Sequence, residues 1–196
     1  LYESGNLFFK INFPKNYPYS PPDVSYVPVN GIRIHPNLYV GGHKSGLGKV
    51  CLSIIGTWSG PQWTTIMDIS TVLLSLQSIL DNDPLLNEPG FHRNNKHQLK
   101  MINNYNDVIF CENIKSLIMK NYSNIPEDFI VFKDTIIDNF KNNYMKIYNN
   151  ILKYKELSDR NIIINIYRIN YEIKIKEIID SYLDFCNKLN LIILNN

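Results

Sequence analysis

The chain has 196 residues and a formal net charge of +2, so it is long enough for one domain with a substantial core, or for a domain with an extension. The small net charge gives no reason to expect nucleic acid or an acidic membrane surface as a partner. The sequence has no run of about 18 apolar residues, which argues against a membrane span, and residues 1–5 lack the basic and apolar zones of a signal peptide.

The three cysteines, Cys51, Cys111 and Cys186, are odd in number and far apart in the sequence. There is no CxxC pair and no histidine pair near a cysteine at zinc-binding spacing, so we expect no metal site. This usage is typical of a reducing compartment and predicts a cytoplasmic or nuclear protein.

The first third of the chain shows the pattern of short strands. Leu7 to Phe13 is mostly apolar and aromatic, and a proline-rich segment follows that cannot be helical. Val24 to Val27 is a second strand, and the turn signal Asn30-Gly31 predicts a hairpin that returns through Ile32 to Ile34. We therefore expect a small antiparallel meander.

The middle of the chain alternates loops with one strong helix. A glycine-rich loop follows His35-Pro36-Asn37, and the apolar stretch Val50 to Ile55 holds Cys51. Asp68 to Leu80 has apolar residues at helical spacing and predicts a helix with Asp68 as N-cap. The apolar positions of its expected buried stripe are Ile69, Val72, Leu73, Leu76, Ile79 and Leu80. The segment from there to about Asn104 is polar and reads as irregular.

The last part of the chain reads as helical. Pro126 opens a long amphipathic pattern that runs from Phe129 to Ile151, and a last helix is expected within Tyr171 to Leu189. Strands followed by helices predict the α+β class. The expected domains are residues 1–104, with the meander sheet flanked by helices, and a helical C-terminal extension over residues 105–196.

Several motifs now fall into a recognisable order. They are Phe13-Pro14, Tyr17-Pro18-Tyr19-Ser20-Pro21-Pro22, His35-Pro36-Asn37, Gly48 to Trp58 with Cys51 inside it, Trp63, and Ile69 to Ile79. Each is weak alone, but their shared order over residues 1–91 resembles the catalytic core of ubiquitin-conjugating enzymes. The resemblance implies the fold of that core, called the UBC fold.

Further residues narrow the resemblance. Most of these enzymes have Asp two positions after the cysteine, where this chain has Ser53. Ser53, Thr57-Trp58 and Asn87-Glu88-Pro89-Gly90-Phe91 resemble the large Z-type enzymes, which charge with ubiquitin and with a tandem ubiquitin-like modifier. The giant hybrid conjugating enzyme/ligases share part of this pattern.

The chain also departs from the family pattern. The interval from Asn37 to Cys51 is longer than usual, so Gly41 to Gly46 reads as an insertion beside the site. Thr64-Thr65 replaces a common Ser-Pro. The chain starts where the family's second strand begins, so we expect it to lack the usual first helix and first strand.

The resemblance assigns catalytic roles to three residues. Cys51 is the expected nucleophile that holds the modifier as a thioester, although an apolar setting by itself favours an inert core thiol. Asn37 is expected to stabilise the oxyanion when a lysine attacks, or else to cap a turn. Glu88 is the best candidate to orient and deprotonate the lysine, ahead of Asp81 and Asp83, through the match of Glu88-Pro89, although acids after a helix are usually only solvated.

Other residues receive binding or structural roles. By resemblance, four residues lie on the loops that meet ligases: Pro18, Tyr19, Trp63 and Thr64. Tyr19 could instead pack inward against the prolines. His35, Trp58, Cys111 and Cys186 are expected to be structural.

The resemblance implies an acyl-transfer enzyme with no metal or organic cofactor, since the activating enzyme spends the ATP. Its expected partners are ubiquitin or a ubiquitin-like protein, the activating enzyme, a ubiquitin ligase and a protein substrate, with no nucleic acid and no membrane. The alternative is a catalytically inactive adaptor that kept the fold. A thiol hydrolase is the weaker third reading.

Overall fold

The computed structural model describes residues 1–193, and by internal contacts they form two compact units. Unit 1 comprises Leu1 and Leu7–Asn106, and unit 2 comprises Tyr2–Asn6 and the chain from Asp107 onward. The division falls inside helix α2, Lys96–Glu112, which therefore contributes to both units. The assignment of residues 1–104 as a separate domain stays a prediction. Within the described part, no helix combines the length and apolar character that a membrane crossing requires.

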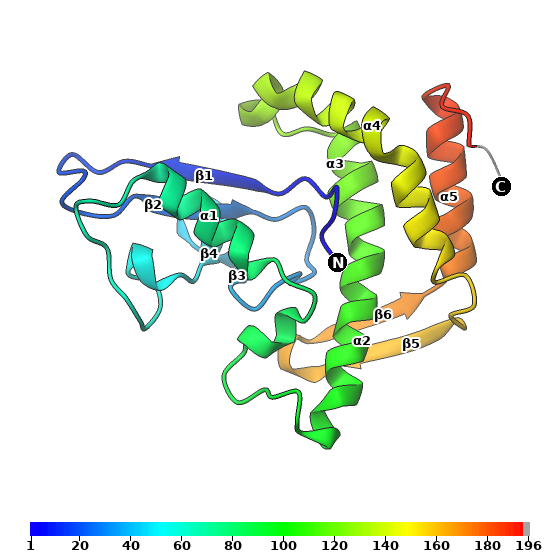
Figure 1. Cartoon of the computed structure of the whole chain (residues 1–196), viewed down its shortest axis with the longest axis horizontal. Helices are drawn as coiled ribbons and strands as arrows, with labels where there is room; N and C mark the ends of the chain where they lie inside the picture. Colours follow the sequence, from blue (N-terminus) through cyan, green and yellow to red (C-terminus); the bar gives the residue numbers. More distant parts are fainter. Residues whose placement is uncertain (194–196) are drawn as a thin grey trace. The chain divides into compact units, whose positions relative to one another are not determined.

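Unit 1 contains a four-stranded antiparallel sheet (Figure 1). Its strands are β1 Phe8–Asn12, β2 Asp23–Val27, β3 Leu38–Gly42 and β4 Gly48–Val50. Their order is β1-β2-β4-β3, so the predicted meander is wrong in its connections. The sheet and the later helices confirm the α+β class.

The turn at Asn30-Gly31 does not lead into a strand. The Asn30 side chain accepts a hydrogen bond from the backbone N–H of Ile32 at 2.9 Å, which closes a turn without starting a strand. The third strand begins only at Leu38, inside the segment predicted as a glycine-rich loop. The expected insertion at Gly41 to Gly46 is therefore the end of β3 and the turn of the β3–β4 hairpin.

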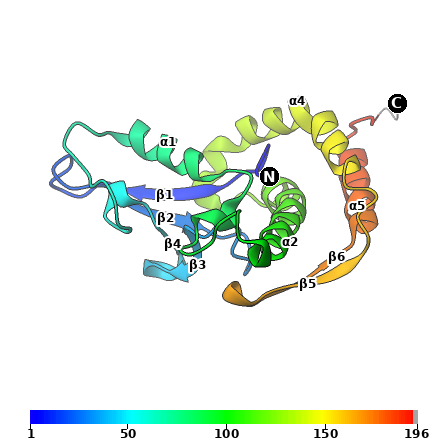
Figure 2. The same cartoon turned by 60° about the horizontal axis from the view of Figure 1, so that its bottom comes forward.

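Helix α1, Ile69–Ile79, lies across one face of this sheet (Figure 2). Asp68 accepts a hydrogen bond from the backbone N–H of Thr71 at 3.1 Å and completes the predicted N-cap. The predicted buried stripe is only partly present, because α1 buries Val72 and Leu76. Leu73 remains 52% exposed.

The helices of unit 2 begin with the end of α2. The polar segment before Asn104 is helical from Lys96, contrary to prediction, because Ile102 and Tyr105 supply buried anchors on one face. After α2 the chain continues as a π-helical stretch, Asn113–Lys120, and as α3, Asn121–Ser123. A 3₁₀ turn at Glu127–Phe132 then leads into α4, Lys133–Leu152, and the last helix is α5, Ile175–Lys188.

The C-terminal extension is not wholly helical, which corrects the prediction. The antiparallel hairpin of β5, Arg160–Ile164, and β6, Ile169–Ile173, connects the end of α4 to the start of α5 (Figure 1). In both strands buried and exposed residues alternate, as expected for strands with one covered face. Ile162 and Tyr171 are paired in register and buried.

Residues 2–6 pack against the π-helical stretch of unit 2. The backbone N–H of Asn6 donates to the carbonyl of Leu117 at 3.0 Å, and the Asn113 side chain donates to the carbonyl of Glu3 at 2.9 Å. A Cβ atom at Gly5 would lie 2.2 Å from Oδ1 of Asn113, so any other residue there would require the Asn113 amide to move. The first residues therefore stabilise unit 2 although they precede the sheet of unit 1 in the sequence.

Candidate active site

Cys51 follows the last residue of β4 and is fixed by two hydrogen bonds to Asn37. Its backbone N–H donates to the carbonyl of Asn37 at 2.9 Å, and the Asn37 side-chain amide donates to the carbonyl of Cys51 at 2.7 Å. The backbone N–H of Asn37 in turn donates to Nδ1 of His35 at 3.0 Å. The loop and the strand end that carry the two predicted catalytic residues are therefore joined directly.

His35 is fully buried, and burial lowers the pKa of its imidazole to about 4. The ring is therefore neutral at physiological pH and can accept the Asn37 hydrogen bond. Its position below the Asn37 turn agrees with the structural role expected for it.

The three predicted catalytic residues line one small pocket of ≈ 10 Å³. Glu88, which directly follows the 3₁₀ turn Pro84–Asn87, contributes to the lining. Cys51 is only 2% exposed, so the pocket is a narrow depression over a covered residue. Its complete lining is Arg33, Pro36, Asn37, Tyr39, Cys51, Trp58, Asn87, Glu88 and Pro89.

Opposing influences act on the Cys51 thiol. Burial raises its pKa above the usual value, and the nearby Glu88 carboxylate raises it further. The positive charges of Lys49 and Arg33, and a hydrogen bond from Tyr39, act in the opposite direction. The net result is a raised pKa, so the resting thiol is mostly protonated at neutral pH.

Sequence reasoning missed two of the lining residues, Arg33 and Tyr39. The Arg33 guanidinium lies 3.6 Å from the centroid of the Tyr39 ring and also donates to the carbonyl of Pro36. These residues flank His35-Pro36-Asn37 on either side. Their closeness to this motif in the sequence was the one feature that could have predicted their place in the pocket. Trp58, expected in the core, is 42% exposed and lines the pocket, so that prediction is wrong.

The acidic residues before Glu88 do not line the pocket. Asp83 forms an ion pair with Arg93 and accepts a hydrogen bond from Asn106 at 3.0 Å. Asp81 accepts hydrogen bonds from the backbone of Asp83 and from the Asn87 side chain. Both therefore organise the loop between α1 and α2, and Glu88 alone of the three borders Cys51.

The two loops assigned to ligase binding lie side by side. The Trp63 indole N–H donates to the carbonyl of Pro18 at 2.7 Å, and the Trp63 ring lies 6.0 Å from that of Tyr17. Tyr19 is 79% exposed, so the alternative of inward packing is wrong for it. Thr64 is also exposed. Ligase binding by these residues stays a prediction.

The other cysteines lie in unit 2 and are free and buried. Burial raises the pKa of Cys111 to about 12 and also raises the pKa of Cys186. These thiols have the environment of core residues, as expected. Over residues 1–193, no group of three or more His, Cys, Asp or Glu side chains is placed to hold a metal ion.

The family model of ubiquitin-conjugating enzymes matches residues 1–116. The chain belongs to the ubiquitin-conjugating enzyme family. The match covers more than half of the chain and includes all the residues that line the Cys51 pocket.

Members of this family with similar sequences include ubiquitin-conjugating enzyme E2 Z of Homo sapiens, which is 41% identical over 116 residues. The E2 Z of Xenopus tropicalis is 40% identical over 116 residues. These alignments cover 58% of this chain, but only 30% of the human protein and 34% of the frog protein. The chain thus spans about a third of the length of these relatives, and the predicted resemblance to Z-type enzymes is confirmed.

A plant relative and one solved structure are also similar. The probable ubiquitin-conjugating enzyme E2 25 of Arabidopsis thaliana is 40% identical over 139 residues, which cover 65% of this chain and 21% of that protein. The E2 domain of a Toxoplasma gondii ubiquitin-conjugating enzyme is 29% identical with a TM-score of 0.39. That match covers 55% of this chain and 66% of the other.

Proposed function

We propose that this chain accepts ubiquitin or a ubiquitin-like protein from an activating enzyme on Cys51 and transfers it to a substrate lysine. In the first step the Cys51 thiolate attacks the activated C-terminal carbonyl, and a thioester forms as the activating enzyme's thiol leaves. In the second step the lysine amine attacks that thioester, an amide bond forms and the Cys51 thiol is released. No metal or organic cofactor takes part.

The observation that carries this proposal is the convergence of Cys51, Asn37 and Glu88 on one pocket. An amide donor beside the sulfur can stabilise the oxyanion of the tetrahedral intermediate. A carboxylate beside it can orient the lysine and accept its proton. These three residues come from three separate segments of the chain, and an adaptor would have no use for their convergence.

The proposed reaction requires the narrow pocket over Cys51 to open. Because Cys51 is 2% exposed in the resting chain, the Arg33–Tyr39 side and the Asn87–Pro89 side must separate to admit a modifier's C-terminus. Trp58 and Pro89 are partly or fully exposed and lie at the surface of this depression. We place the entrance for the incoming C-terminus there.

The test is incubation of the chain with activating enzyme, ATP and modifier, followed by electrophoresis with and without reducing agent. The expected product is an adduct that thiols cleave and that is absent from Cys51→Ala. Cys51→Ser should instead give an ester adduct that resists thiols, because its nucleophile is oxygen. Cys186→Ala is the control and should charge like the parent. A folded chain that forms no adduct with ubiquitin or with any ubiquitin-like protein would contradict the proposal.

The closed pocket favours a second candidate, an inactive binding module of the ubiquitin pathway. A covered cysteine with a raised pKa is what a chain that kept the fold without catalysis would show. This candidate predicts ubiquitin binding, seen by NMR as shifts of surface amides, without any thiol-sensitive adduct. The charging assay above separates it from the enzyme.

We also propose that Pro18, Tyr19, Trp63 and Thr64 form the ligase-binding surface. The Trp63–Pro18 hydrogen bond keeps the two loops together, and Tyr19 projects from them into solvent. Tyr19→Ala should weaken transfer that depends on a ligase and leave charging of Cys51 unchanged. Equal transfer by this variant and the parent would remove Tyr19 from the surface.

A further inference from the structure

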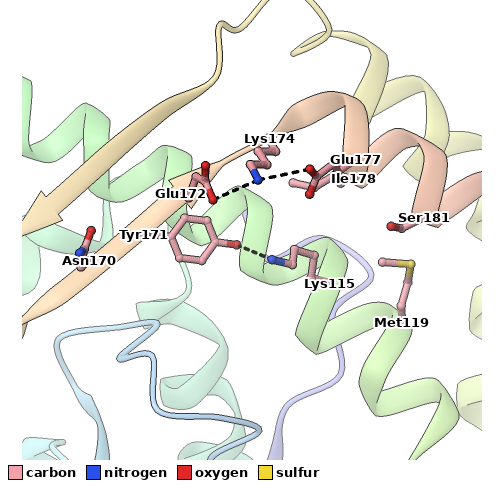
Figure 3. A pocket seen from close by; sticks show the side chains of 9 residues that line it. All are labelled: Lys115, Met119, Asn170, Tyr171, Glu172, Lys174, Glu177, Ile178 and Ser181. Carbon is pink, nitrogen blue, oxygen red and sulfur yellow. Dashed lines mark hydrogen bonds and ion pairs between the residues drawn. The ribbon is translucent and has the colours of Figure 1, made fainter.

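Unit 2 contains a pocket of ≈ 480 Å³ that the proposed transfer reaction does not use. Its residues come from three elements of that unit: the π-helical stretch, β6 and the first two turns of α5 with the preceding Lys174 (Figure 3). Its lining is Lys115, Met119, Asn170, Tyr171, Glu172, Lys174, Glu177, Ile178 and Ser181.

One side of the pocket presents a cation that is held in place by a buried network. The Lys115 ammonium donates to the Tyr171 hydroxyl at 3.5 Å and lies 5.3 Å from the centroid of that ring. The hydroxyl of Tyr171 donates in turn to Glu112 at 2.8 Å, and Ser116 donates to the second oxygen of Glu112 at 2.7 Å. Since Tyr171 and Glu112 are buried, this chain of donors fixes where the ammonium lies.

Lys115 makes no direct ion pair within the described residues. Its partner Tyr171 is neutral, because burial and the adjacent Glu112 charge raise the pKa of the phenol. The buried Glu112 carboxylate reaches Lys115 only through the Tyr171 hydroxyl, so the exposed ammonium can still pair directly with an incoming carboxylate.

The other side of the pocket has the opposite charge. The Lys174 ammonium forms ion pairs with two carboxylates, Glu172 at 3.2 Å and Glu177 at 3.4 Å. Figure 3 shows it between them. One ammonium between two exposed carboxylates leaves an excess negative charge on that side. Met119 and Ile178 add apolar side chains to the lining, so the pocket combines a positive side, a negative side and an apolar lining.

The pocket lies along the edge of β6 that no strand among residues 1–193 covers. Asn170 and Glu172 point to the exposed face of the hairpin and Tyr171 to the buried face, yet all three line the pocket. Strand β5 covers one edge of β6 and contributes no lining residue. Side chains from both faces of a strand border the same space only at its uncovered edge, where an extended peptide can add main-chain hydrogen bonds.

We propose that this pocket is a docking site for an extended segment of a partner protein, in which an acidic side chain pairs with Lys115 and a basic side chain meets Glu172 and Glu177. The apolar lining, Met119 and Ile178, accommodates the stems of the two side chains. This site is separate in sequence and in unit from the Cys51 pocket, and its test does not depend on thioester formation.

The test uses NMR of the whole chain labelled with ¹³C at the methionine methyl groups. The chain has four methionines, of which Met119 lines the pocket, and Met119→Leu assigns its signal. The probes are blocked peptides with a central Glu-Thr-Lys or Lys-Thr-Glu triplet, and matched peptides with Gln in place of Glu. One of the two peptides, Glu-Thr-Lys or Lys-Thr-Glu, should shift the Met119 signal until the pocket is saturated. The signals of Met67 and Met145 should stay in place.

Two charge variants make the test specific. Lys115→Gln should weaken binding of the Glu-containing peptide roughly two- to fivefold, as expected for one exposed ion pair. Glu177→Gln should weaken it by a similar factor and should not affect a peptide that has Thr in place of Lys. Lys141→Gln, an exposed change on α4 outside the pocket, is the matched control and should bind as the parent does.

Three results would overturn the proposal. The first is a Met119 signal that does not move at millimolar peptide, and the second is equal binding of the Glu and Gln peptides. The third is equal loss of affinity in Lys115→Gln and Lys141→Gln, which would indicate general charge attraction. Because Lys115 and Glu177 are exposed, their variants should melt at the parent temperature, and that measurement excludes unfolding as the cause.

Discussion

Asn37 and Cys51 hold each other by two hydrogen bonds, one from the Cys51 backbone N–H and one from the Asn37 side-chain amide. The amide that the proposed mechanism needs for the oxyanion is therefore bonded to the carbonyl of Cys51 in the resting chain. It lies beside the reacting residue, and the proposed mechanism requires it to release this carbonyl and reach the thioester oxygen. A turn-stabilising role and a catalytic role are compatible in this geometry.

Asn37→Ala should separate these two roles. Loss of the 2.7 Å hydrogen bond should lower the free energy of unfolding by about 1 kcal/mol. Loss of the oxyanion donor should slow discharge of a preformed Cys51 thioester onto free lysine by about 10²-fold. Chemical denaturation and a discharge assay measure the two effects. Asn16→Ala, which removes an exposed side-chain hydrogen bond to Ser20, is the control, and a normal discharge rate in Asn37→Ala would contradict the catalytic role.

The reactivity of Cys51 should rise steeply with pH. Below its pKa the thiolate fraction of a thiol increases about tenfold per pH unit, and burial places the pKa of Cys51 above the usual value of about 8.5. Alkylation by iodoacetamide should therefore keep accelerating beyond pH 8.5. Mass spectrometry of the Cys51 peptide follows this reaction without interference from Cys111 and Cys186.

Two neighbours of Cys51 should move this pH profile in opposite directions. Tyr39→Phe removes a hydrogen bond that lowers the thiol pKa, so its profile should shift to higher pH. Glu88→Gln removes a negative charge that raises the thiol pKa, so its profile should shift to lower pH. Shifts in the same direction for both variants would show that they act through access to the sulfur and not through its ionisation.

His35 should make the chain sensitive to acid. Its pKa is about 4 in the folded chain and near 6.5 when unfolded, so the unfolded state binds the proton more tightly. The stabilisation by neutral His35 is complete above pH 6.5, decreases as the pH falls and is lost below about pH 4. The total is about 3 kcal/mol. Urea unfolding across this range in the parent and in His35→Asn should show a weaker pH dependence for the variant. The exposed change His97→Asn should leave the dependence unchanged.

Gly48 should be intolerant of a side chain. A Cβ atom there would lie 1.9 Å from the carbonyl oxygen of Tyr39, so Gly48→Ala must push β3 and β4 apart. We expect a loss of about 1–3 kcal/mol in unfolding free energy and a changed alkylation rate at Cys51, because Tyr39 borders that pocket. Gly31→Ala is the matched control, since no atom lies within 4 Å of its added Cβ. Equal melting temperatures for the two variants would contradict this account.

The sequence predicted local features well where the preference of a residue type is strong, as for an N-cap aspartate or for prolines. Asp68 is the N-cap of α1, as its position before an apolar helical pattern indicated, and the proline-rich segment after β1 is not helical. The order of the short motifs around Cys51 indicated the family, which the family match confirms. The same motifs named three residues that the fold brings to one pocket, and their roles stay predictions.

The sequence failed where long-range pairing decides the outcome. Asn30-Gly31 has the sequence signal of a hairpin turn, but strand β3, which pairs with β4, starts only at Leu38. Which strands pair depends on the packing of the whole sheet. The β5–β6 hairpin lies in a segment that lacks a turn signal such as Asn-Gly, and Arg168 adopts the left-handed conformation at its turn instead. Leu73 has a helical apolar position but stays half exposed, and α1 buries only Val72 and Leu76.

The sequence by itself determined the family, the α+β class and the N-cap of α1 at Asp68. Only the tertiary structure decided that Trp58 faces outward, that Arg33 and Tyr39 border Cys51, and that Lys115 is held by Tyr171 and Glu112 at the edge of β6. The physical reason is that backbone preferences and short motifs act over a few neighbouring residues. Burial, charge pairing and pocket lining depend on residues that meet only after the chain has folded.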